Sequence, residues 1–426
     1  MSFNLGDFLI SLIKFTVFDY LRGVWGDQPW VEPVLDVIGA MVLATFCLLI
    51  VLVLIWLERK LIARIQDRIG PNRVGGKYGL LQSLADALKL LTKELITPAG
   101  ADRWAYNLAP FLIVMTSLLM WAVLPFAPGV VGVDLNIGIF FVMAVSSVSV
   151  VTLLLAGWGS NNKYALLGAF RSVAQLVSYE VPMILALLIP ILLARSMSTV
   201  DIIAAQDLPF LIFVPLSALI FFISALAETG RTPFDLLEAE SEIVAGFHVE
   251  YSGMKFAMFF LAEFLGTFFM SAFFSVIYLG GWNIPIINAI LGIFNVHVDL
   301  ATLAFGRPLG ILIFFFKTFA VYSVFVWIRG TLPRVRIDQM LNFNWKFLVP
   351  LSLALILMVA VLDKVMDLYF DPSFLTRAGV HLLSNILLGY AALELARWYA
   401  RRQRLAEEGE ENLEIEAPVA EAAPAH

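Results

Sequence analysis

The residues best suited to chemistry are carboxylates that recur at close spacing between two apolar stretches. The segment begins Glu-Thr-Gly-Arg-Thr-Pro-Phe-Asp at residue 228. Its acidic residues are Glu228, Asp235, Glu238, Glu240, Glu242 and Glu250. Carboxylates crowded beside a membrane disfavour one another's ionised form, so they hold protons that can be exchanged. We interpret the segment as a proton-exchanging carboxylate cluster.

The start of this acidic segment also predicts the first turn of a helix. Thr232 is placed as the N-cap, Pro233 as the first helical residue and Asp235 as the capping acid. The alternative is that the acids only stabilise a helix N-terminus. That effect fades within one turn, so it accounts for Asp235 and not for the acids that follow.

Ionisable side chains also occur inside apolar stretches long enough to cross a bilayer. Glu180 precedes Pro182 in one stretch, and Glu263 and Lys317 lie in two others. A charge at bilayer depth costs about 3 kcal/mol on insertion scales, so it usually faces a protein interior and marks an ion or proton route. Glu180 is therefore a candidate proton carrier, while Lys317 fits a functional or a structural role equally well.

A second charged segment, residues 58–107, combines a basic, glycine-containing turn with an amphipathic helix. It opens with Glu58-Arg59-Lys60 and includes Gly70-Pro71-Asn72-Arg73-Val74-Gly75. The lysine and hydroxyl of a phosphate-binding loop are absent after these glycines, so no nucleotide site is expected. The leucines that follow recur every three or four residues, at 81, 84, 88, 91 and 95. This spacing predicts a helix at the membrane surface, for which anchoring alone is a sufficient explanation.

Composition places these segments in an all-α integral membrane protein. Of 426 residues, 60% are hydrophobic and 15% charged, with a mean hydropathy of +0.87, which is too apolar for a water-soluble core. The apolar residues form long runs and do not alternate, which excludes an outer-membrane barrel. A bilayer crossing needs about 20 apolar residues. About nine transmembrane helices are predicted, at 37–57, 108–127, 137–158, 173–194, 209–227, 256–279, 308–328, 347–366 and 379–398.

The distribution of Lys and Arg predicts the orientation of these helices. One set of connecting segments holds 21 of them and the other holds 5, and basic segments remain in the cytoplasm. We therefore expect the N-terminus outside and the C-terminus inside. The expected domains are an extracytoplasmic or interfacial segment (1–36), a membrane domain (37–398) with cytoplasmic loops 58–107, 228–255 and 329–346, and an acidic cytoplasmic tail (399–426).

The inventory of metal-binding residues is small. Cys47 is the sole cysteine, and the four histidines are widely separated. These residues do not supply a disulfide, an iron–sulfur cluster or a zinc site. We expect no metal or redox cofactor to be bound by this chain alone.

The three charged loops together resemble the H subunit of respiratory complex I, whose mitochondrial counterpart is subunit 1 of NADH dehydrogenase. The resemblance rests on Glu58-Arg59-Lys60 with the turn at 70–75 and residues 85–90, on the acidic motif from 228 to 251, and on residues 329–338. It extends from about 37 to 367 and leaves the ninth helix and the acidic tail outside, as an extension.

The resemblance implies a membrane subunit of a proton-pumping NADH-quinone oxidoreductase in the bacterial cytoplasmic membrane. This subunit forms the quinone-access tunnel and couples quinone reduction to proton translocation. Quinone is the substrate, whereas FMN and iron–sulfur clusters belong to partner subunits of the peripheral arm. Further partners are the other membrane-arm subunits and lipid, with no nucleic acid.

The family's roles can be carried over residue by residue. They place Arg59, Arg68, Arg231 and Phe234 on or near the quinone tunnel. The entrance helix carries Asp86, Leu88 and Lys89. The proton route consists of Glu180, Glu228, Asp235, Glu238, Glu240, Glu242 and Glu263.

Two alternatives remain open at this stage. The first is the equivalent subunit of a membrane-bound hydrogenase or of a ferredoxin- or deazaflavin-linked relative. The near-complete acidic loop favours complex I over it. The second is an autonomous ion transporter, against which the lack of an inverted repeat argues. Nothing in the sequence distinguishes ubiquinone from menaquinone.

Overall fold

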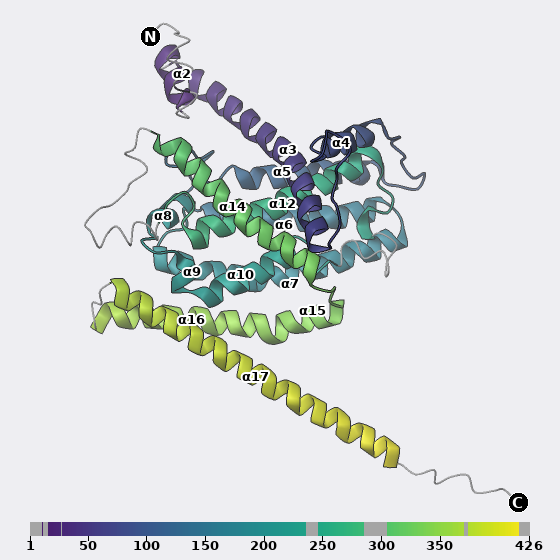
Figure 1. Ribbon diagram of the computed structural model, residues 1–426, viewed down its shortest axis with the longest axis vertical. Coiled ribbons are helices and arrows are strands. Elements are labelled where there is room, and N and C mark those ends of the chain that lie inside the picture. Colours follow the sequence, from purple (N-terminus) through teal and green to yellow (C-terminus); the bar gives the residue numbers. More distant parts are fainter. Residues whose placement is uncertain are drawn as a thin grey trace, which may run out of the picture.

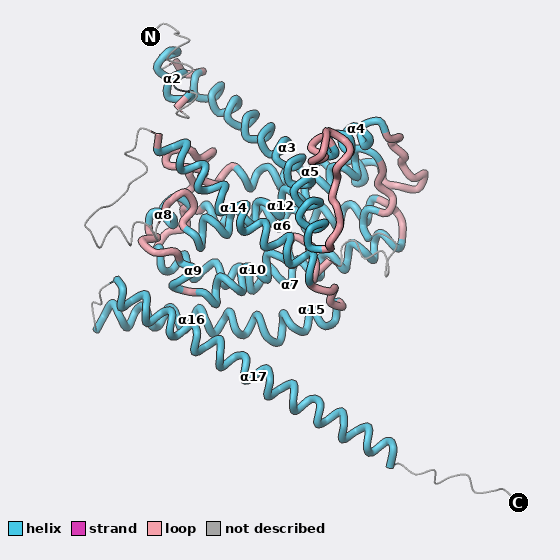
Figure 2. The backbone as a smooth tube through the Cα atoms, viewed as in Figure 1, coloured by secondary structure: helices cyan, strands magenta, loops and turns pink. Residues whose placement is uncertain are grey.

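Long apolar helices make up most of the chain that the computed structural model describes, residues 11, 16–26, 28–235, 246–284, 305–369 and 374–416 (Figure 1). Over these residues the backbone is drawn as helices joined by loops (Figure 2). The long helices are α3 (Val31–Ile65), α5 (Arg103–Trp121), α6 (Gly138–Gly159), α7 (Lys163–Ala194), α10 (Pro215–Glu228), α12 (Gly253–Leu279), α14 (Gly306–Thr331), α16 (Val349–Tyr369) and α17 (Phe374–Glu416). The short ones are α2 (Val17–Trp25), α4 (Gln82–Thr92), α8 (Thr199–Ala204), α9 (Phe210–Phe213), α15 (Ile337–Phe343), η1 (Gly246–His248) and η2 (Asn344–Leu348).

Each apolar run predicted from the sequence falls mainly on helix, although the run 108–127 continues past the end of α5 at Trp121. Within the described residues, 8 helices are long and apolar enough to cross a membrane. The remaining run, 209–227, is divided between α9 and α10 because the helix breaks at Val214. Pro215 lacks the backbone N–H that a continuous helix needs, and it disfavours a helical conformation in the residue before it. The fold is thus an all-α membrane bundle.

The core of the bundle lies around α12. In its most apolar window 78% of the residues are buried inside the protein, against 17% for both α3 and α17. Aromatic rings fill the space beside α12, with 5.5 Å between the ring centroids of Trp121 and Phe268 and 6.0 Å between those of Phe221 and Phe273. Helices α3 and α17 therefore lie at the periphery, where their apolar side chains are free to face lipid.

The last helix, α17, packs along α16, α10 and α9 and then extends away from the body (Figure 1). Ion pairs hold its first turns. Arg377 pairs with Asp363 and, at 3.1 Å, with Asp367, which also lies 2.6 Å from the guanidinium of Arg195. The helix continues through Glu416, so it includes most of the segment that the sequence marked as an acidic tail.

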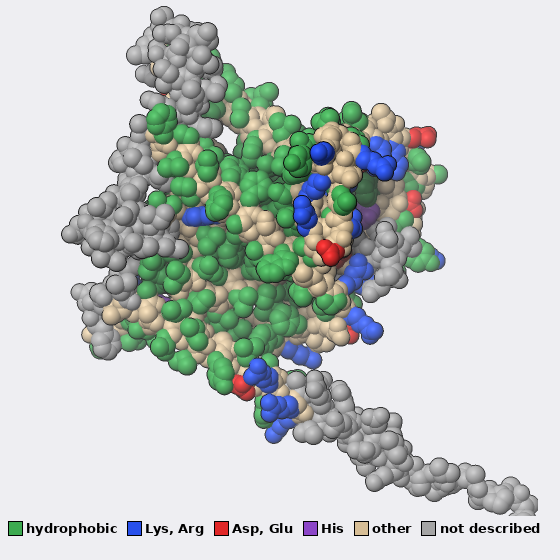
Figure 3. All heavy atoms as spheres, viewed as in Figure 1, with side chains coloured by type: hydrophobic (Ala, Val, Ile, Leu, Met, Phe, Trp, Pro, Cys, Tyr) green, Lys and Arg blue, Asp and Glu red, His purple; other side chains and the backbone are tan. Residues whose placement is uncertain are grey.

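The surface separates apolar from charged side chains. Figure 3 shows hydrophobic side chains over most of the visible face of the body, with Lys and Arg gathered around α4 and where α17 leaves the bundle. This separation is expected of a helical bundle whose sides face lipid and whose loops face water. The charged loops, where the candidate chemistry lies, are thereby collected at the ends of the helices.

Candidate functional site: a buried charge cluster beneath three loops

The three charged loops singled out in the sequence contact one another. The backbone N–H of Val335, in the third loop, donates to the carbonyl of Pro233 in the second at 3.0 Å. The first and second loops are joined where the Ile96 N–H donates to Ser252 Oγ at 3.0 Å and the Tyr106 hydroxyl donates to the Glu250 carbonyl at 2.9 Å. Segments far apart in sequence thus form one assembly at the ends of the helices.

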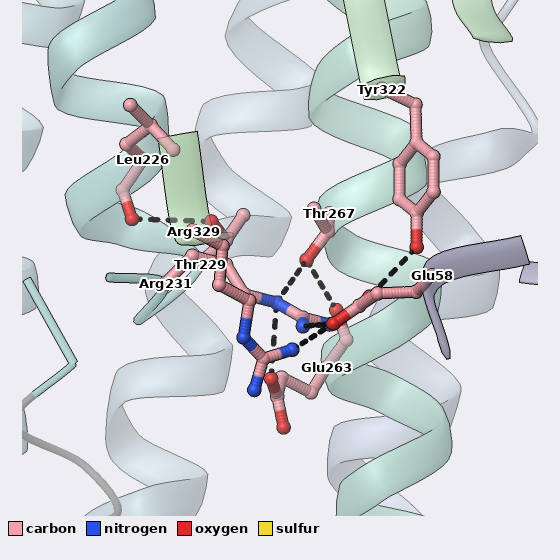
Figure 4. Close-up of polar contacts among 8 residues, drawn as sticks. All are labelled: Glu58, Leu226, Thr229, Arg231, Glu263, Thr267, Tyr322 and Arg329. Atoms are coloured by element: carbon pink, nitrogen blue, oxygen red, sulfur yellow. Dashed lines mark hydrogen bonds and ion pairs between the residues drawn. The ribbon is translucent and has the colours of Figure 1, made fainter. Parts of the chain in front are cut away.

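A cluster of charged side chains lies beneath these loops, and its centre is Glu58 (Figure 4). Arg231 Nη1 donates to Glu58 Oε1 at 2.8 Å, and the Arg329 guanidinium pairs with the same oxygen. The Tyr322 hydroxyl donates to Glu58 Oε2 at 3.0 Å. The side chains of Glu58 and Arg231 are only 5% and 3% exposed, so both charges depend on protein partners and not on water.

Arg231 also joins Glu58 to a second carboxylate. Its Nε lies 3.2 Å from Glu263 Oε1 and 3.3 Å from Thr267 Oγ1, and its guanidinium lies over the Phe264 ring, 4.6 Å from the centroid. Burial alone would lower the pKa of Arg231, but Glu58 and Glu263 outweigh burial and raise that pKa. Arg231 therefore stays charged, and it carries the interaction between a carboxylate on α3 and one on α12.

The turn that carries Arg231 follows directly from the end of α10. The Arg231 N–H donates to the Leu226 carbonyl at 3.2 Å, and Gly230 has a φ of 62°, a conformation that glycine adopts without strain. Phe234 follows, with its ring 5.3 Å from that of Tyr179 between centroids. The turn thus directs Arg231 into the cluster and Phe234 against α7.

The prediction that a helix begins at Pro233 is wrong for the described residues, which form a turn from Arg231 to Asp235. The Phe234 N–H donates back to the Arg231 carbonyl, and the carbonyl of Pro233 accepts from Val335. The carbonyls of Arg231 and Pro233 therefore accept hydrogen bonds from the turn and from the third loop, and not the bonds of a helix that begins at Pro233.

A cavity of about 120 Å³ lies beside the cluster, between α5, α6, α7 and α12. Glu228, His248 and Glu263 line it together with several phenylalanine rings. Within the described residues Glu228 Oε2 is buried without a hydrogen-bond partner. An ionisable group in that state needs a proton, a water or a cation, so the cavity suits proton exchange.

His248 reaches this cavity because η1 lies close against α7. A side chain at Gly168 would come within 2.7 Å of the Gly246 backbone, so the approach requires glycine. Burial lowers the pKa of His248 to about 4. The imidazole is therefore neutral near pH 7, and it is a polar, uncharged part of the cavity wall.

The residues that the resemblance assigned to the quinone tunnel do not all gather in one place. Arg231 and Phe234 lie on one turn. Arg59 is 43% exposed and pairs with Asp86 on α4. Arg68 is exposed and donates to Gln66 Oε1 at 2.9 Å. The cluster thus includes one of the four residues and contacts the turn that carries a second.

The predicted amphipathic helix is present as α4. It ends at Thr92, because Lys93 is extended, so Leu95 lies beyond it. Asp86 joins this helix to the end of α3 through Arg59 and lies 3.5 Å from Lys89 Nζ. Leu88 and Leu91 are exposed. The leucine face is therefore open for contact with lipid or with an apolar ligand.

The acids assigned to the proton route have different surroundings. Glu180 Oε1 accepts from the Ser147 hydroxyl at 2.8 Å, which joins α7 to α6. Asp235 lies 3.4 Å from Arg334 Nη2 in the third loop. Glu228 and Glu263 share the cavity. The other acids assigned to this route, Glu238, Glu240 and Glu242, lie outside the described residues.

Lys317, for which the sequence left two roles open, is engaged by backbone carbonyls. Its Nζ donates to the carbonyls of Leu279, Gly281 and Asn283 at 2.7, 2.9 and 2.6 Å. Leu279 ends α12, where the helix dipole favours a positive charge. These contacts support the structural role, that of capping α12.

Sequence reasoning missed three members of the cluster, Glu58, Tyr322 and Arg329, as site residues. Glu58 and Arg329 each belong to a charged motif that was recognised, but basic or acidic residues at helix ends are usually explained by membrane anchoring. One feature of the sequence could have indicated Glu58 and Arg329. Each lies within one turn of a long apolar run, where a charge needs a partner.

Comparison with known proteins agrees with this architecture. A family model described as NADH dehydrogenase matches residues 38–360. The H subunit of NADH-quinone oxidoreductase from Dehalococcoides mccartyi (strain CBDB1) is 48% identical over 359 residues, which are 84% of this chain and 94% of the relative. Proteins of the same name are 48% identical in Geobacillus kaustophilus, over 76% of this chain and 92% of the relative, and 44% identical in Carboxydothermus hydrogenoformans, over 77% and 92%.

These matches define the class of protein to which the site belongs. The chain is a multi-pass membrane subunit of the NADH dehydrogenase family. Within that family it belongs with the H subunits of NADH-quinone oxidoreductase, the respiratory complex I. Helix α17 lies entirely beyond residue 360, where the match to the family model ends.

Proposed function

We propose that this chain forms the quinone-access path of complex I and couples the reduction of quinone to the movement of protons. The observation that carries the proposal is the buried pair of Arg231 and Glu58, which connects the turn of Arg231 and Phe234 to Glu263 and hence to the cavity. Substrate chemistry at the turn and protonation in the cavity thereby act on the same guanidinium.

The chemistry of quinone reduction fits this arrangement. A quinone accepts two electrons and two protons to become a quinol, and electrons without protons leave negative charge on the headgroup. A nearby guanidinium is attracted to that charge and is drawn from its carboxylate partners. Glu263 then has less positive charge beside it and binds a proton more readily. On this proposal the electrons come from FMN and iron–sulfur clusters in partner subunits.

The entrance for the quinone tail is proposed at α4. This helix presents exposed leucines beside the α3 end that carries Arg59. An isoprenoid chain needs a continuous apolar surface from the lipid into the protein, and an amphipathic helix at the membrane surface provides one. We further propose that the three loops face the cytoplasm and that the N-terminus lies outside, because the loops carry most of the Lys and Arg.

The relatives' names favour complex I over the other classes considered. The three relatives from Dehalococcoides, Geobacillus and Carboxydothermus are all named as the H subunit of NADH-quinone oxidoreductase. The hydrogenase-type alternative predicts instead that the chain copurifies with a hydrogenase module. An inventory of the copurifying subunits by mass spectrometry tests this point directly.

The substitution Glu180→Gln tests the coupling. Glutamine keeps the size of the side chain and can still bond Ser147, but it cannot exchange a proton. The variant complex should assemble and still oxidise NADH with a soluble acceptor. It should lose quinone reduction and proton translocation together, because a coupled enzyme cannot perform one without the other.

The matched control is Glu394→Gln in α17. Glu394 is also a helical glutamate, but it is 44% exposed, pairs with Arg397 and lies outside the family match. This variant should retain both activities. An assembled Glu180→Gln complex that reduces quinone and pumps protons at wild-type rates would exclude Glu180 from the proton route.

A further inference from the structure

One glutamine on α7 holds the turn that carries Arg231. Gln175 is fully buried, and its Nε2 donates to the Ala227 carbonyl at 2.7 Å and to the Phe234 carbonyl at 2.8 Å. Both partners are carbonyls, so only the NH₂ end of the amide satisfies them. The two acceptors are seven residues apart, at the two ends of the turn.

The backbone of the turn between these two carbonyls makes few other hydrogen bonds to the rest of the protein. Within the described residues its own backbone N–H groups make four such bonds: Thr229 to the Ala225 carbonyl at 3.0 Å, Gly230 to the Ala227 carbonyl at 3.2 Å, Arg231 to the Leu226 carbonyl at 3.2 Å and Phe234 to the Arg231 carbonyl at 2.9 Å. All of these lie within the turn or the end of α10. Gln175 and Val335 instead join the backbone of the turn to other elements.

The contacts of Gln175 fix the side chains that the turn presents. Glu228 follows Ala227 directly, and Arg231 stands midway between the two acceptors. A shift of either end changes the distance from Arg231 to Glu58, now 2.8 Å, or the place of Glu228 on the cavity wall. A buried network of this kind has little tolerance for such a shift, because each displaced charge loses its partner.

The same stretch of α7 also contacts the third loop and α6. The Tyr179 hydroxyl donates to the Met340 carbonyl at 3.2 Å, and the Ser178 carbonyl accepts from Asn344 Nδ2 at 2.6 Å. Glu180, which bonds Ser147, is the next residue. Residues 175–180 therefore hold the second loop, the third loop and a membrane carboxylate in one fixed arrangement.

We propose that Gln175 is a positioning residue, whose amide sets the turn of residues 227–234 so that Arg231 and Glu228 face the cluster and the cavity. The inference rests on the proposed function, since it assigns a support to the same site. The inference is about the geometry of the turn, and the proposed function is about quinone kinetics. The two can therefore be tested by separate measurements.

The direct test is Gln175→Met in the intact complex. Methionine keeps the approximate length and volume but donates no hydrogen bond, so two buried carbonyls lose a partner. We expect the complex to assemble and the amides of residues 230, 231 and 234 to exchange hydrogen about tenfold faster, as for the loss of a hydrogen bond of ordinary strength. Unchanged exchange in an assembled Gln175→Met complex would overturn the inference.

Two further variants serve as a second test and as a control. Gln175→Asn keeps a buried amide but is one methylene shorter, so it cannot reach both carbonyls, and it too should speed exchange in the turn. If Gln175→Met fails to assemble, Gln175→Asn decides the question by the same measurement. Ser172→Ala is the control, because Ser172 is equally buried one turn earlier and its hydroxyl donates to the Gly168 carbonyl, within α7 itself. It should leave exchange in the turn at the wild-type rate.

Kinetics then separate the inference from the proposed function. With a short-tailed quinone, Gln175→Met should raise KM about tenfold, as expected when a binding group is misplaced, while NADH oxidation with a soluble acceptor is unchanged. If the variant shows faster hydrogen exchange in the turn but wild-type quinone kinetics, Gln175 positions the turn, and the role of the turn in quinone reduction is refuted. Normal exchange with a raised KM would overturn the positioning role.

Discussion

The pairing of Glu58 with Arg231 permits a stability test that does not depend on any assumption about catalysis. Glu58→Gln keeps the shape of the side chain and removes its charge. Arg231, with its side chain 3% exposed, then retains one carboxylate, Glu263. Arg329 loses the carboxylate with which it pairs, but its side chain is 28% exposed and is partly solvated.

The expected cost follows from these burials. Removing one partner of a buried ion pair costs about 3–5 kcal/mol, because the remaining charge stays in a poorly solvated place. Glu263 compensates Arg231 in part, so the lower end of that range, about 3 kcal/mol, is the expectation for Glu58→Gln. Tyr322→Phe removes one hydrogen bond to the same carboxylate and should cost less, about 2 kcal/mol.

A double-mutant cycle measures the pair itself. The complex is purified with Glu58→Gln, with Arg231→Gln and with both, and the thermal midpoint of disassembly is followed by native gels. Because the double variant contains neither charge, it should be less destabilised than the sum of the single variants by about 2 kcal/mol. Additive effects would refute the reasoning, since they would mean that the two charges do not stabilise each other.

Two further predictions concern the entrance helix and the cavity. Leu88→Lys places a charge on the exposed leucine face of α4, so turnover with long-tailed quinones should fall severalfold more than NADH oxidation with a soluble acceptor; equal loss of both would indicate failed assembly. Burial lowers the pKa of His248 to about 4, so the folded chain binds a proton at this imidazole less tightly than the unfolded chain does. The folded chain therefore loses stability as the pH falls from about 6.5 toward about 4. His248→Asn should therefore disassemble at a lower pH than the wild type while matching it at pH 8, and coincident acid midpoints would contradict the assignment.

The membrane fold was predictable because its signal is long and repeated. A run of apolar residues long enough to cross the bilayer has few alternatives to a helix, since lipid cannot satisfy backbone hydrogen bonds. The break at Val214 was less visible, because the run 209–227 is apolar on both sides of Pro215. Proline occurs within the membrane helix α7 without ending it, at Pro182 and Pro190, so the residue alone does not decide where a helix ends.

The site was predictable only in part, because its members come from four separate segments. Arg231 and Glu263 were selected from their own motifs, but nothing in those motifs indicates that they pair. Arg231 also pairs with Glu58, which lies 173 residues away in the sequence. Such pairing depends on how α3, α12 and α14 pack, which residue spacing along one helix does not determine.

The packing also explains why the two carboxylates of the cluster have different tasks under the proposed function. Glu58 is 5% exposed and is held by three donors, two guanidinium groups and a tyrosine hydroxyl. Glu263 is 21% exposed, pairs with Arg231 and faces the cavity. Under the proposed function Glu263 is the carboxylate that exchanges a proton, while Glu58 keeps the shared guanidinium in the protein. On this proposal, negative charge that develops near the turn of Arg231 draws the arginine toward it, and Glu263 responds by taking up a proton on the side of the cavity.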